Sequence, residues 1–245
     1  MNEIREHVAV SFVLPAYNEG NCIENALEKL DATVNHYGLR YEVVVVDDGS
    51  LDDTRVKALR YALRNGHVKV VGYDRNVGKG FAVKTGFEAA VGDAVVFADS
   101  DLDIDFGQIE KYLNALKCGD IVIGCKWHKD SVVLVPPVRR FLGPCFNLLA
   151  KLLTGIRLSD TQTGIKAVRR EEFEKVFTSM SVKRYAFDVE LLAVAKVFGL
   201  RVIELPVRVT INNGFKLKDI WHMLLDLLCI AYRLRIKRWY QLGMH

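Results

Sequence analysis

The chain has 245 residues and a mass of 27.7 kDa, half of its residues are hydrophobic, and its mean hydropathy is +0.10. This composition excludes a disordered chain and allows a sizeable core. No run of 18 apolar residues occurs, so no transmembrane helix is expected, and the first ten residues lack the long apolar stretch of a signal peptide. The five cysteines include no Cys-x-x-Cys pair, which predicts reduced, mostly buried thiols in a cytosolic protein.

The net charge of +4 is concentrated at the C-terminal end. Residues 214–245 contain six lysines and arginines against two aspartates, so the rest of the chain is balanced. A balanced body disfavours nucleic-acid binding, and a basic end indicates an anionic surface nearby.

Short apolar runs rich in Val and Ile alternate with stretches of helical spacing. We predict strands over residues 8–14, 42–46, 68–71, 94–98, 120–123 and 201–205. The runs are continuous rather than alternating, which is typical of strands buried on both faces of a mostly parallel sheet. The predicted fold class is therefore α/β, with helices on both faces of the sheet. Five glycines before such strands are predicted to end helices in the left-handed conformation: Gly38, Gly66, Gly92, Gly119 and Gly199.

Three polar clusters directly follow the first, second and fourth predicted strands. They are residues 15–19 (Pro-Ala-Tyr-Asn-Glu), 47–50 (Asp-Asp-Gly-Ser) and 99–101 (Asp-Ser-Asp). Ligands of open α/β sheets bind beyond the carboxyl ends of the strands, so we expect the clusters to converge on one crevice. The same residue types also build turns and caps, but their recurrence at three strand ends favours a binding site for a nucleotide or a cation.

Asp99 and Asp101 lie one residue apart at a strand end, where two unpaired carboxylates would repel each other. A Mg²⁺ or Mn²⁺ ion removes that cost, because hard cations bind carboxylate oxygens together with substrate phosphates. Asp103 supplies a further acceptor, and the segment lacks the Gly and Glu positions of an EF-hand loop. The sequence therefore predicts a divalent metal here.

Residues 76–80 (Asn-Val-Gly-Lys-Gly) open a predicted helix that continues to Ala90. Backbone N–H groups and Lys79 at a helix N-terminus suit an anion such as a nucleotide phosphate. The segment is not a Walker A loop, because Gly80 stands where Ser or Thr belongs. It is not a dinucleotide fingerprint either, because no glycine follows three residues later.

Taken in order, the motifs PAYNE, VVDDGS, NVGKG and ADSD resemble those of the family-2 glycosyltransferases of the GT-A fold. The second half is similar to the polyprenyl-phosphate branch of that family, which contains the dolichyl-phosphate glucose and mannose synthases. The motifs that carry this second resemblance are Gly124-Cys-Lys126, Arg139-Arg140, Asp160-Thr-Gln-Thr-Gly164, Phe187-Asp-Val-Glu190 and Glu204-Leu-Pro206. The resemblance spans residues 8–236 and implies a GT-A domain over 1–213, followed by a basic amphipathic tail over 214–245.

The resemblance implies a metal-dependent, inverting transfer of a hexose from a nucleotide sugar to a polyprenyl or dolichyl phosphate. UDP-glucose is the expected donor, with GDP-mannose as the alternative. The implied nucleotide-sugar contacts are Pro15, Ala16, Tyr17, Glu19, Asp47, Asp48, Lys79, Asp99 and Ser100. The implied metal ligands are Asp99, Asp101 and Asp103. The implied catalytic residues are Asp101, Arg139, Arg140 and Asp160, and the acceptor phosphate is assigned to Lys126, Arg139, Arg140 and Lys216.

The acceptor chemistry agrees with that assignment. A phosphomonoester is already anionic near neutral pH, because its second pKa is about 6, so cations are needed to dock it more than a base to activate it. The chain departs from the family pattern at three positions. Lys126 stands where relatives usually carry arginine, Asp103 where mannose-synthase relatives often carry glutamine, and Phe215 where a serine is usual.

Two later segments have apolar stripes at helical spacing, over residues 141–156 and 217–236. Such stripes usually pack in a core, but the neighbouring cations and aromatic residues favour helices that lie in a membrane interface. We therefore expect peripheral binding at the cytoplasmic face of the membrane, with a membrane-protein partner left open. Between these segments, Asp188 and Glu190 are predicted to share the tasks of pairing with an arginine and orienting a loop.

Two other functions remain open from the sequence. An enzyme with the same donor and a soluble hydroxyl acceptor is disfavoured by Arg139-Arg140, because a neutral hydroxyl needs a base rather than cations. A non-catalytic nucleotide-sugar-binding membrane subunit is disfavoured by Asp99 and Asp101.

Overall fold

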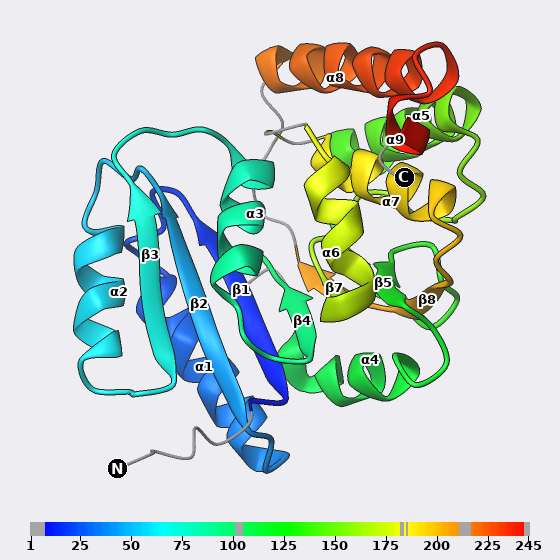
Figure 1. The fold of residues 1–245 in the computed structure, drawn as a ribbon. Coiled ribbons are helices and arrows are strands. Elements are labelled where there is room, and N and C mark those ends of the chain that lie inside the picture. The colour runs from blue at the N-terminus through cyan, green and yellow to red at the C-terminus, as the bar shows by residue number, and fades with distance from the viewer. Residues whose placement is uncertain (1–7, 101–104, 182–183, 185, 211–216, 243–245) are drawn as a thin grey trace.

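The computed structural model of the protein describes residues 8–100, 105–181, 184, 186–210 and 217–242. A seven-stranded sheet runs through it in the order β3-β2-β1-β4-β7-β5-β8 (Figure 1). The strands are β1 (Val10–Ala16), β2 (Tyr41–Asp48), β3 (Val68–Tyr73), β4 (Ala94–Phe97), β5 (Ile121–Cys125), β7 (Lys166–Arg169) and β8 (Val202–Pro206). All six predicted strands are present, with ends shifted by one or two residues, and the α/β fold class is confirmed.

The sheet is parallel except for its fifth position. β1 pairs in parallel with β2 and β4, β2 with β3, and β5 with β8, whereas β7 is antiparallel to both β4 and β5. The sequence did not predict β7, because the strand has four residues and begins with a buried lysine. Its register sets Lys166 opposite Phe97 and Ile123. The carboxyl ends of β1, β2, β4, β5 and β8 therefore share one edge of the sheet.

Helices cover both faces of this sheet, as the strand residues require. Phe12 and Leu14 point to one core and Val13 to the other, which is the period of two expected for a strand buried on both faces. One face carries α1 (Ile23–His36), α2 (Thr54–Ala62), the short 3₁₀ turn η1 (Phe106–Gln108) and α4 (Ile109–Ala115). The other carries α3 (Lys79–Ala89), α6 (Arg170–Ser179) and α7 (Phe187–Val197).

Two further helices, α8 (Leu217–Arg235) and α9 (Trp239–Leu242), pack on α7, and α5 (Pro137–Thr154) packs on α8 (Figure 1). Leu227, Ile230 and Tyr240 belong to the same core cluster as α7, so the C-terminal segment packs on the body through its inner face. A small parallel sheet joins β6 (Val132–Leu134) to β9 (Arg208–Thr210). Within the described ranges, no helix has both the length and the apolar character needed to cross a bilayer.

One set of glycine predictions needs correction. Gly38 and Gly199 have the predicted positive φ, but Gly66, Gly92 and Gly119 do not. Two of these three serve close packing instead, since an added Cβ would lie 2.6 Å from the Ser11 nitrogen at Gly92 and 2.7 Å from Ile203 Cδ1 at Gly119.

The cysteines are mostly not buried, contrary to the prediction. Cys125 is buried on β5 and Cys22 is half-buried, whereas Cys118, Cys145 and Cys229 are exposed. Two of the exposed thiols lie on α5 and α8, whose outer faces remain open.

Candidate active site

The three polar clusters meet at the carboxyl edge of the sheet, as predicted. The Ser100 hydroxyl, beyond β4, donates to the carbonyl oxygen of Pro15 on β1 at 2.9 Å. The backbone N–H of Asn18, beyond β1, donates to the Ser50 hydroxyl, beyond β2, at 3.0 Å. Ala16 and Asp47 are register partners at the ends of β1 and β2. These contacts bring the ends of all three strands together at one place on the sheet edge.

Asp48 is only 3% exposed, and its carboxylate holds the loop that leads into α3. It accepts hydrogen bonds from the Asn76 amide at 2.9 Å, from the N–H of Val77 at 2.9 Å, and from the N–H of Gly78 at 3.0 Å. The Tyr73 hydroxyl donates to it at 2.7 Å. Asp48 thus fixes the loop that precedes α3.

Glycine is needed at two points of that arrangement. Gly49 has a φ of 68°, and a Cβ there would lie 2.4 Å from the carbonyl carbon of Arg75. Gly78 has a φ of 121° and directly precedes the first residue of α3. Side chains are strained at such φ values, so these glycines let the two loops approach each other.

Lys79 begins α3, as predicted, and forms an ion pair with Asp99 beyond β4. Both side chains are about a quarter exposed, so the pair is partly open to solvent. Tyr17 is exposed at the same edge, and Glu19 accepts a hydrogen bond from the Cys22 thiol at 2.9 Å. The helix N-terminus adds positive potential at this point, which suits a phosphate group.

The structure describes only one of the three predicted metal ligands. Asp101 and Asp103 lie outside the described residues, which leaves Asp99 as the described member of the predicted set. In the part of the chain that the structure describes, no three His, Cys, Asp or Glu side chains are grouped to hold a metal. The donor set predicted from sequence consists of carboxylates alone, and these are the ligands that Mg²⁺ and Mn²⁺ prefer.

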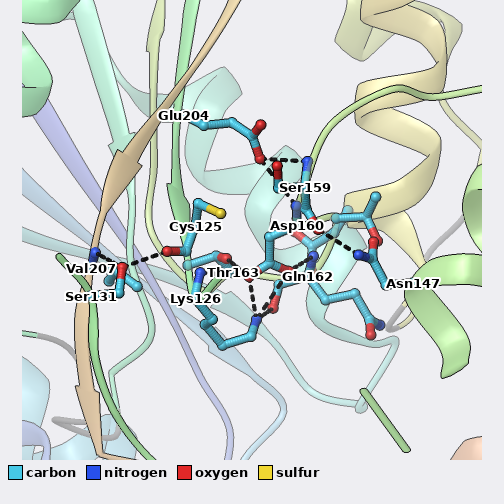
Figure 2. A network of polar contacts seen from close by, with 12 residues as sticks. Cys125, Lys126, Ser131, Asn147, Ser159, Asp160, Gln162, Thr163, Glu204 and Val207 are labelled. Atoms are coloured by element: carbon cyan, nitrogen blue, oxygen red, sulfur yellow. Dashed lines mark hydrogen bonds and ion pairs between the residues drawn. The ribbon is translucent and has the colours of Figure 1, made fainter. Parts of the chain in front are cut away.

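A second polar site lies beyond β5, where Lys126 meets Asp160 (Figure 2). The Lys126 ammonium lies 2.9 Å from Asp160 Oδ2 and donates to the Gln162 carbonyl oxygen at 2.7 Å. Asp160 is 2% exposed and also accepts from the backbone N–H groups of Lys126 and Gln162. Burial by itself would raise the pKa of Asp160, but the Lys126 charge and these N–H donors outweigh it and hold that pKa below its ordinary value.

The loop 159–163 that carries Asp160 is fixed from both sides. Glu204 on β8 accepts the backbone N–H groups of Ser159 at 2.7 Å and Asp160 at 3.1 Å. From the other side, the Asn147 amide on α5 donates to the Ser159 carbonyl oxygen at 2.5 Å (Figure 2). The sequence reasoning missed Asn147, although a single amide within the apolar segment 146–150 was a signal that could have found it.

Behind this loop, Lys166 forms a buried ion pair with Asp188 at 2.6 Å and also contacts the Thr163 carbonyl oxygen. Glu190, further along α7, lies 3.4 Å from Arg233 and accepts the N–H of Ser181 at 3.0 Å. The predicted arginine pair and the loop contact therefore both belong to Glu190, and Asp188 pairs with a lysine instead.

The remaining predicted acceptor residues are only partly described. Arg140 is exposed in the first turn of α5. Arg139 belongs to the same turn, but its side chain is outside the described part, and so is Lys216. Only β7 separates β4 from β5 in the sheet, so the ends of those two strands lie two strand spacings, about 10 Å, apart.

Residues 11–177 match the family model described as glycosyl transferase family 2. The chain belongs to this family. The GT-A fold and the resemblance predicted from the motifs are therefore confirmed.

Among relatives of this glycosyltransferase, the dolichyl-phosphate beta-glucosyltransferase of Mus musculus is 34% identical over 249 residues, covering 94% of this chain and 77% of the relative. The Drosophila melanogaster protein with the same name is 35% identical, with shares of 94% and 76%. Glycosyltransferase AglD of Haloferax volcanii is 35% identical over 82% of this chain, which spans only 33% of AglD.

Solved structures of the same fold include mannosyl-3-phosphoglycerate synthase from Rubrobacter xylanophilus, with a TM-score of 0.69 at 21% identity, covering 93% of this chain and 74% of that one. Glucosyl-3-phosphoglycerate synthase from Mycobacterium tuberculosis, in complex with Mn²⁺, UDP and glucosyl-3-phosphoglycerate, gives a TM-score of 0.67 at 24% identity, covering 92% and 79%. At these identities, the likeness concerns the fold.

Proposed function

We propose that this glycosyltransferase transfers glucose from UDP-glucose to a dolichyl or other polyprenyl phosphate, with inversion at the sugar carbon. The observation that carries the proposal is the pairing of two sites on one sheet edge. The Lys79–Asp99 pair lies beyond β4 and the Lys126–Asp160 pair beyond β5, and these strands end about 10 Å apart, a separation that would accommodate one sugar between donor and acceptor phosphates. The dolichyl-phosphate glucosyltransferase relatives support the choice of glucose and of the lipid.

The donor would bind in the crevice beyond β1, β2 and β4. Tyr17 and Glu19 line its open side, the Asp48-held loop shapes its floor, and Lys79 at the start of α3 lies where a diphosphate needs positive charge. Asp99, together with Asp101 and Asp103, would hold Mg²⁺ or Mn²⁺. A divalent ion there stabilises the negative charge that develops on the departing nucleoside diphosphate.

The acceptor phosphate would dock at the cations beyond β5 and on α5. A phosphate oxygen attacks C1 of glucose while the bond from C1 to the β-phosphate oxygen breaks, and UDP leaves. The attacking phosphate is already ionised, so no proton has to be removed. Lys126, Arg139, Arg140 and Lys216 are the proposed dock. Because Asp160 is buried and saturated with donors, its proposed role is to hold Lys126 rather than to accept a proton.

We also propose that the outer faces of α5 and α8 rest on the membrane that contains the acceptor. Both helices pack inward on the body, yet each keeps an exposed apolar row on its outer side. These rows are Val138, Phe141, Leu148 and Leu152 on α5, and Trp221, Leu225, Leu228, Tyr232 and Ile236 on α8 and just beyond it. The exposed cations Arg235, Lys237 and Arg238 flank Ile236 at the end of the α8 row, as is typical of helices at an anionic bilayer.

The reaction is tested with radiolabelled UDP-glucose and GDP-mannose, a short polyprenyl phosphate, and parallel samples with EDTA. We expect organic-soluble counts from UDP-glucose alone and their loss with the chelator. Counts in a water-soluble product would favour a soluble acceptor, and donor binding without any product would favour a non-catalytic subunit. Synthesis that is unaffected by EDTA would contradict the metal.

The membrane face is tested by substitution, because deleting the segment would remove the buried Leu227 and Tyr240 from the core. The variant W221S/L225S/L228S is compared with V56S/L59S/L63S, a comparably spaced exposed set on and just beyond α2, far from α8 in Figure 1. We expect sedimentation with vesicles that contain anionic lipid to fall at least about tenfold only for the α8 variant. Equal sedimentation of both variants would contradict this face.

A further inference from the structure

The inner side of α5 carries a polar group that reaches the second site. Asn147 is 8% exposed, whereas its neighbour Leu148 and Phe141 are exposed, so these apolar side chains lie on a different side of the helix from Asn147. Thr154, two turns later on α5, is also buried, but its hydroxyl donates to the carbonyl oxygen of Ala150 in its own helix at 2.6 Å. Within the described part of α5, Asn147 is thus the side chain that hydrogen-bonds to the loop 159–163.

Asn147 uses both ends of its amide on that loop. Its Nδ2 donates to the Ser159 carbonyl oxygen at 2.5 Å, and its Oδ1 accepts from the Thr161 hydroxyl at 3.0 Å. The two contacts flank Asp160 on either side (Figure 2). A buried amide that is satisfied at both ends fixes a loop in position and orientation, because moving the loop would leave buried polar groups unpaired.

The position of the Lys126 ammonium depends on the same loop. Its Nζ contacts the Asp160 carboxylate, at 2.9 and 3.2 Å, and the Gln162 carbonyl oxygen, at 2.7 Å. All three acceptor atoms belong to residues 160–162. Displacing the loop would therefore displace the charge of Lys126 while leaving the donor crevice beyond β1 and β2 untouched.

We propose that Asn147 is a positioning residue for acceptor binding: it ties α5 to the loop 159–163 and thereby sets the place of Lys126. The acceptor part of this inference rests on the function proposed above. Asn147 itself touches no substrate in this scheme. Its effect is specific to the phosphate that Lys126 meets and does not extend to the nucleotide.

The test compares two variants that each remove one buried polar group from the inner face of α5. Asn147→Leu breaks both loop contacts, whereas Thr154→Val breaks the contacts of the Thr154 hydroxyl with the Ala150 carbonyl oxygen in the helix and with the N–H of Ile156 just beyond it. Calorimetry measures binding of farnesyl phosphate, a short prenyl phosphate, and separately of UDP with Mn²⁺. We expect Asn147→Leu to weaken farnesyl phosphate binding by at least about tenfold and to change UDP binding by less than about twofold. Thr154→Val should leave both affinities within about twofold of wild type.

Asn147→Asp supports the test should Asn147→Leu fail to fold, since it keeps the size and the acceptor but loses the donor to Ser159. Its farnesyl phosphate affinity should fall in the same direction, again with UDP binding retained. Wild-type farnesyl phosphate affinity in a folded Asn147 variant, equal losses for both ligands, or no farnesyl phosphate binding by the wild type would each overturn the inference.

The outcome is distinguishable from that of the proposed function. If the wild type binds farnesyl phosphate in an Asn147-dependent way but transfers no glucose to it, the function is wrong and the positioning role stands. If glucose transfer occurs and the Asn147 variants keep the wild-type KM for the lipid, the positioning role is wrong and the function stands.

Discussion

At the scale of single residues, Asp48 shows how a buried carboxylate shapes a site that it need not touch. Its oxygens take up the donors of the loop ahead of α3, so removing the charge should loosen that loop. We expect Asp48→Asn to lower the free energy of unfolding by about 2–3 kcal/mol, because an amide cannot accept all of these N–H groups. Urea unfolding measures this, and UDP affinity should fall in parallel.

The matched control for that prediction is Asp74→Asn. The Asp74 side chain is 98% exposed and lies 3.7 Å from Arg55, an ion pair of little energetic value in water. Its substitution should change the free energy of unfolding by less than about 0.5 kcal/mol. Comparable losses in the two variants would contradict the account of Asp48.

The lowered pKa of Asp160 predicts how the stability of the fold changes at acidic pH. Because the folded-state pKa lies below the unfolded-state value, the ionised carboxylate stabilises the fold at neutral pH. That contribution is lost as the pH falls from about 4 through the folded-state pKa. The difference in free energy of unfolding between wild type and Asp160→Asn should therefore shrink between about pH 6 and about pH 3. A difference that stays constant over this range would show that the charge of Asp160 does not stabilise the fold.

The candidate-site residues whose position could be predicted from the sequence are those that follow strand ends. Asp48, Lys79 and Asp99 lie at or near the ends of apolar runs, so the α/β fold by itself brings them to one edge. Asn147 and Glu204 were not assigned to the site, because they converge on the loop 159–163 from a helix and a strand that lie 12 and 45 positions from Ser159. Such convergence depends on tertiary packing that no local pattern contains.

At the scale of elements, α5 has two glycines that should respond in opposite ways to the same change. Gly155 ends the helix with a φ of 71°, whereas Gly143 lies in its interior, where an added Cβ would meet nothing within 4 Å. Gly143→Ala should raise the free energy of unfolding by about 0.5–1 kcal/mol, and Gly155→Ala should lower it by about 1 kcal/mol. Thermal and urea unfolding compare them, and effects of equal sign would contradict the assigned end of α5.

The elements that sequence predicted well were the long apolar strands, and the ones it missed were short. β6 and β9 have three residues each and β7 has four, too few for a periodic pattern to stand out. β7 also begins with Lys166, whose burial is possible only because Asp188 on α7 faces it. The sequence therefore did not predict β7, because a lysine at the start of a short segment normally indicates an exposed position.

At the scale of the whole molecule, Glu190 adds polar contacts to the apolar packing that holds the C-terminal helices on the body. This buried carboxylate accepts the Tyr240 hydroxyl from α9 at 2.6 Å. We expect Tyr240→Phe to cost about 1–3 kcal/mol of unfolding free energy, because it leaves a buried charge short of one donor. Tyr37→Phe removes an exposed hydroxyl contact with Gly107 at 3.1 Å and should cost less than about 0.5 kcal/mol. Equal costs in urea unfolding would count against this contribution of Glu190.

The thickness of α5 affects how far the proposed prenyl phosphate acceptor must move to reach Lys126. The exposed row of this helix and Asn147 lie on different sides of one α-helix, whose diameter with side chains is about 10 Å. If the outer row rests on the headgroups as proposed, Lys126, which is held by the loop on the Asn147 side of the helix, would stand above the bilayer plane rather than within it. A prenyl phosphate would then have to move partly out of its leaflet to react, with its first isoprenoid unit passing through the headgroup layer. The enzyme would therefore extract its acceptor from the bilayer instead of reacting with it inside the bilayer.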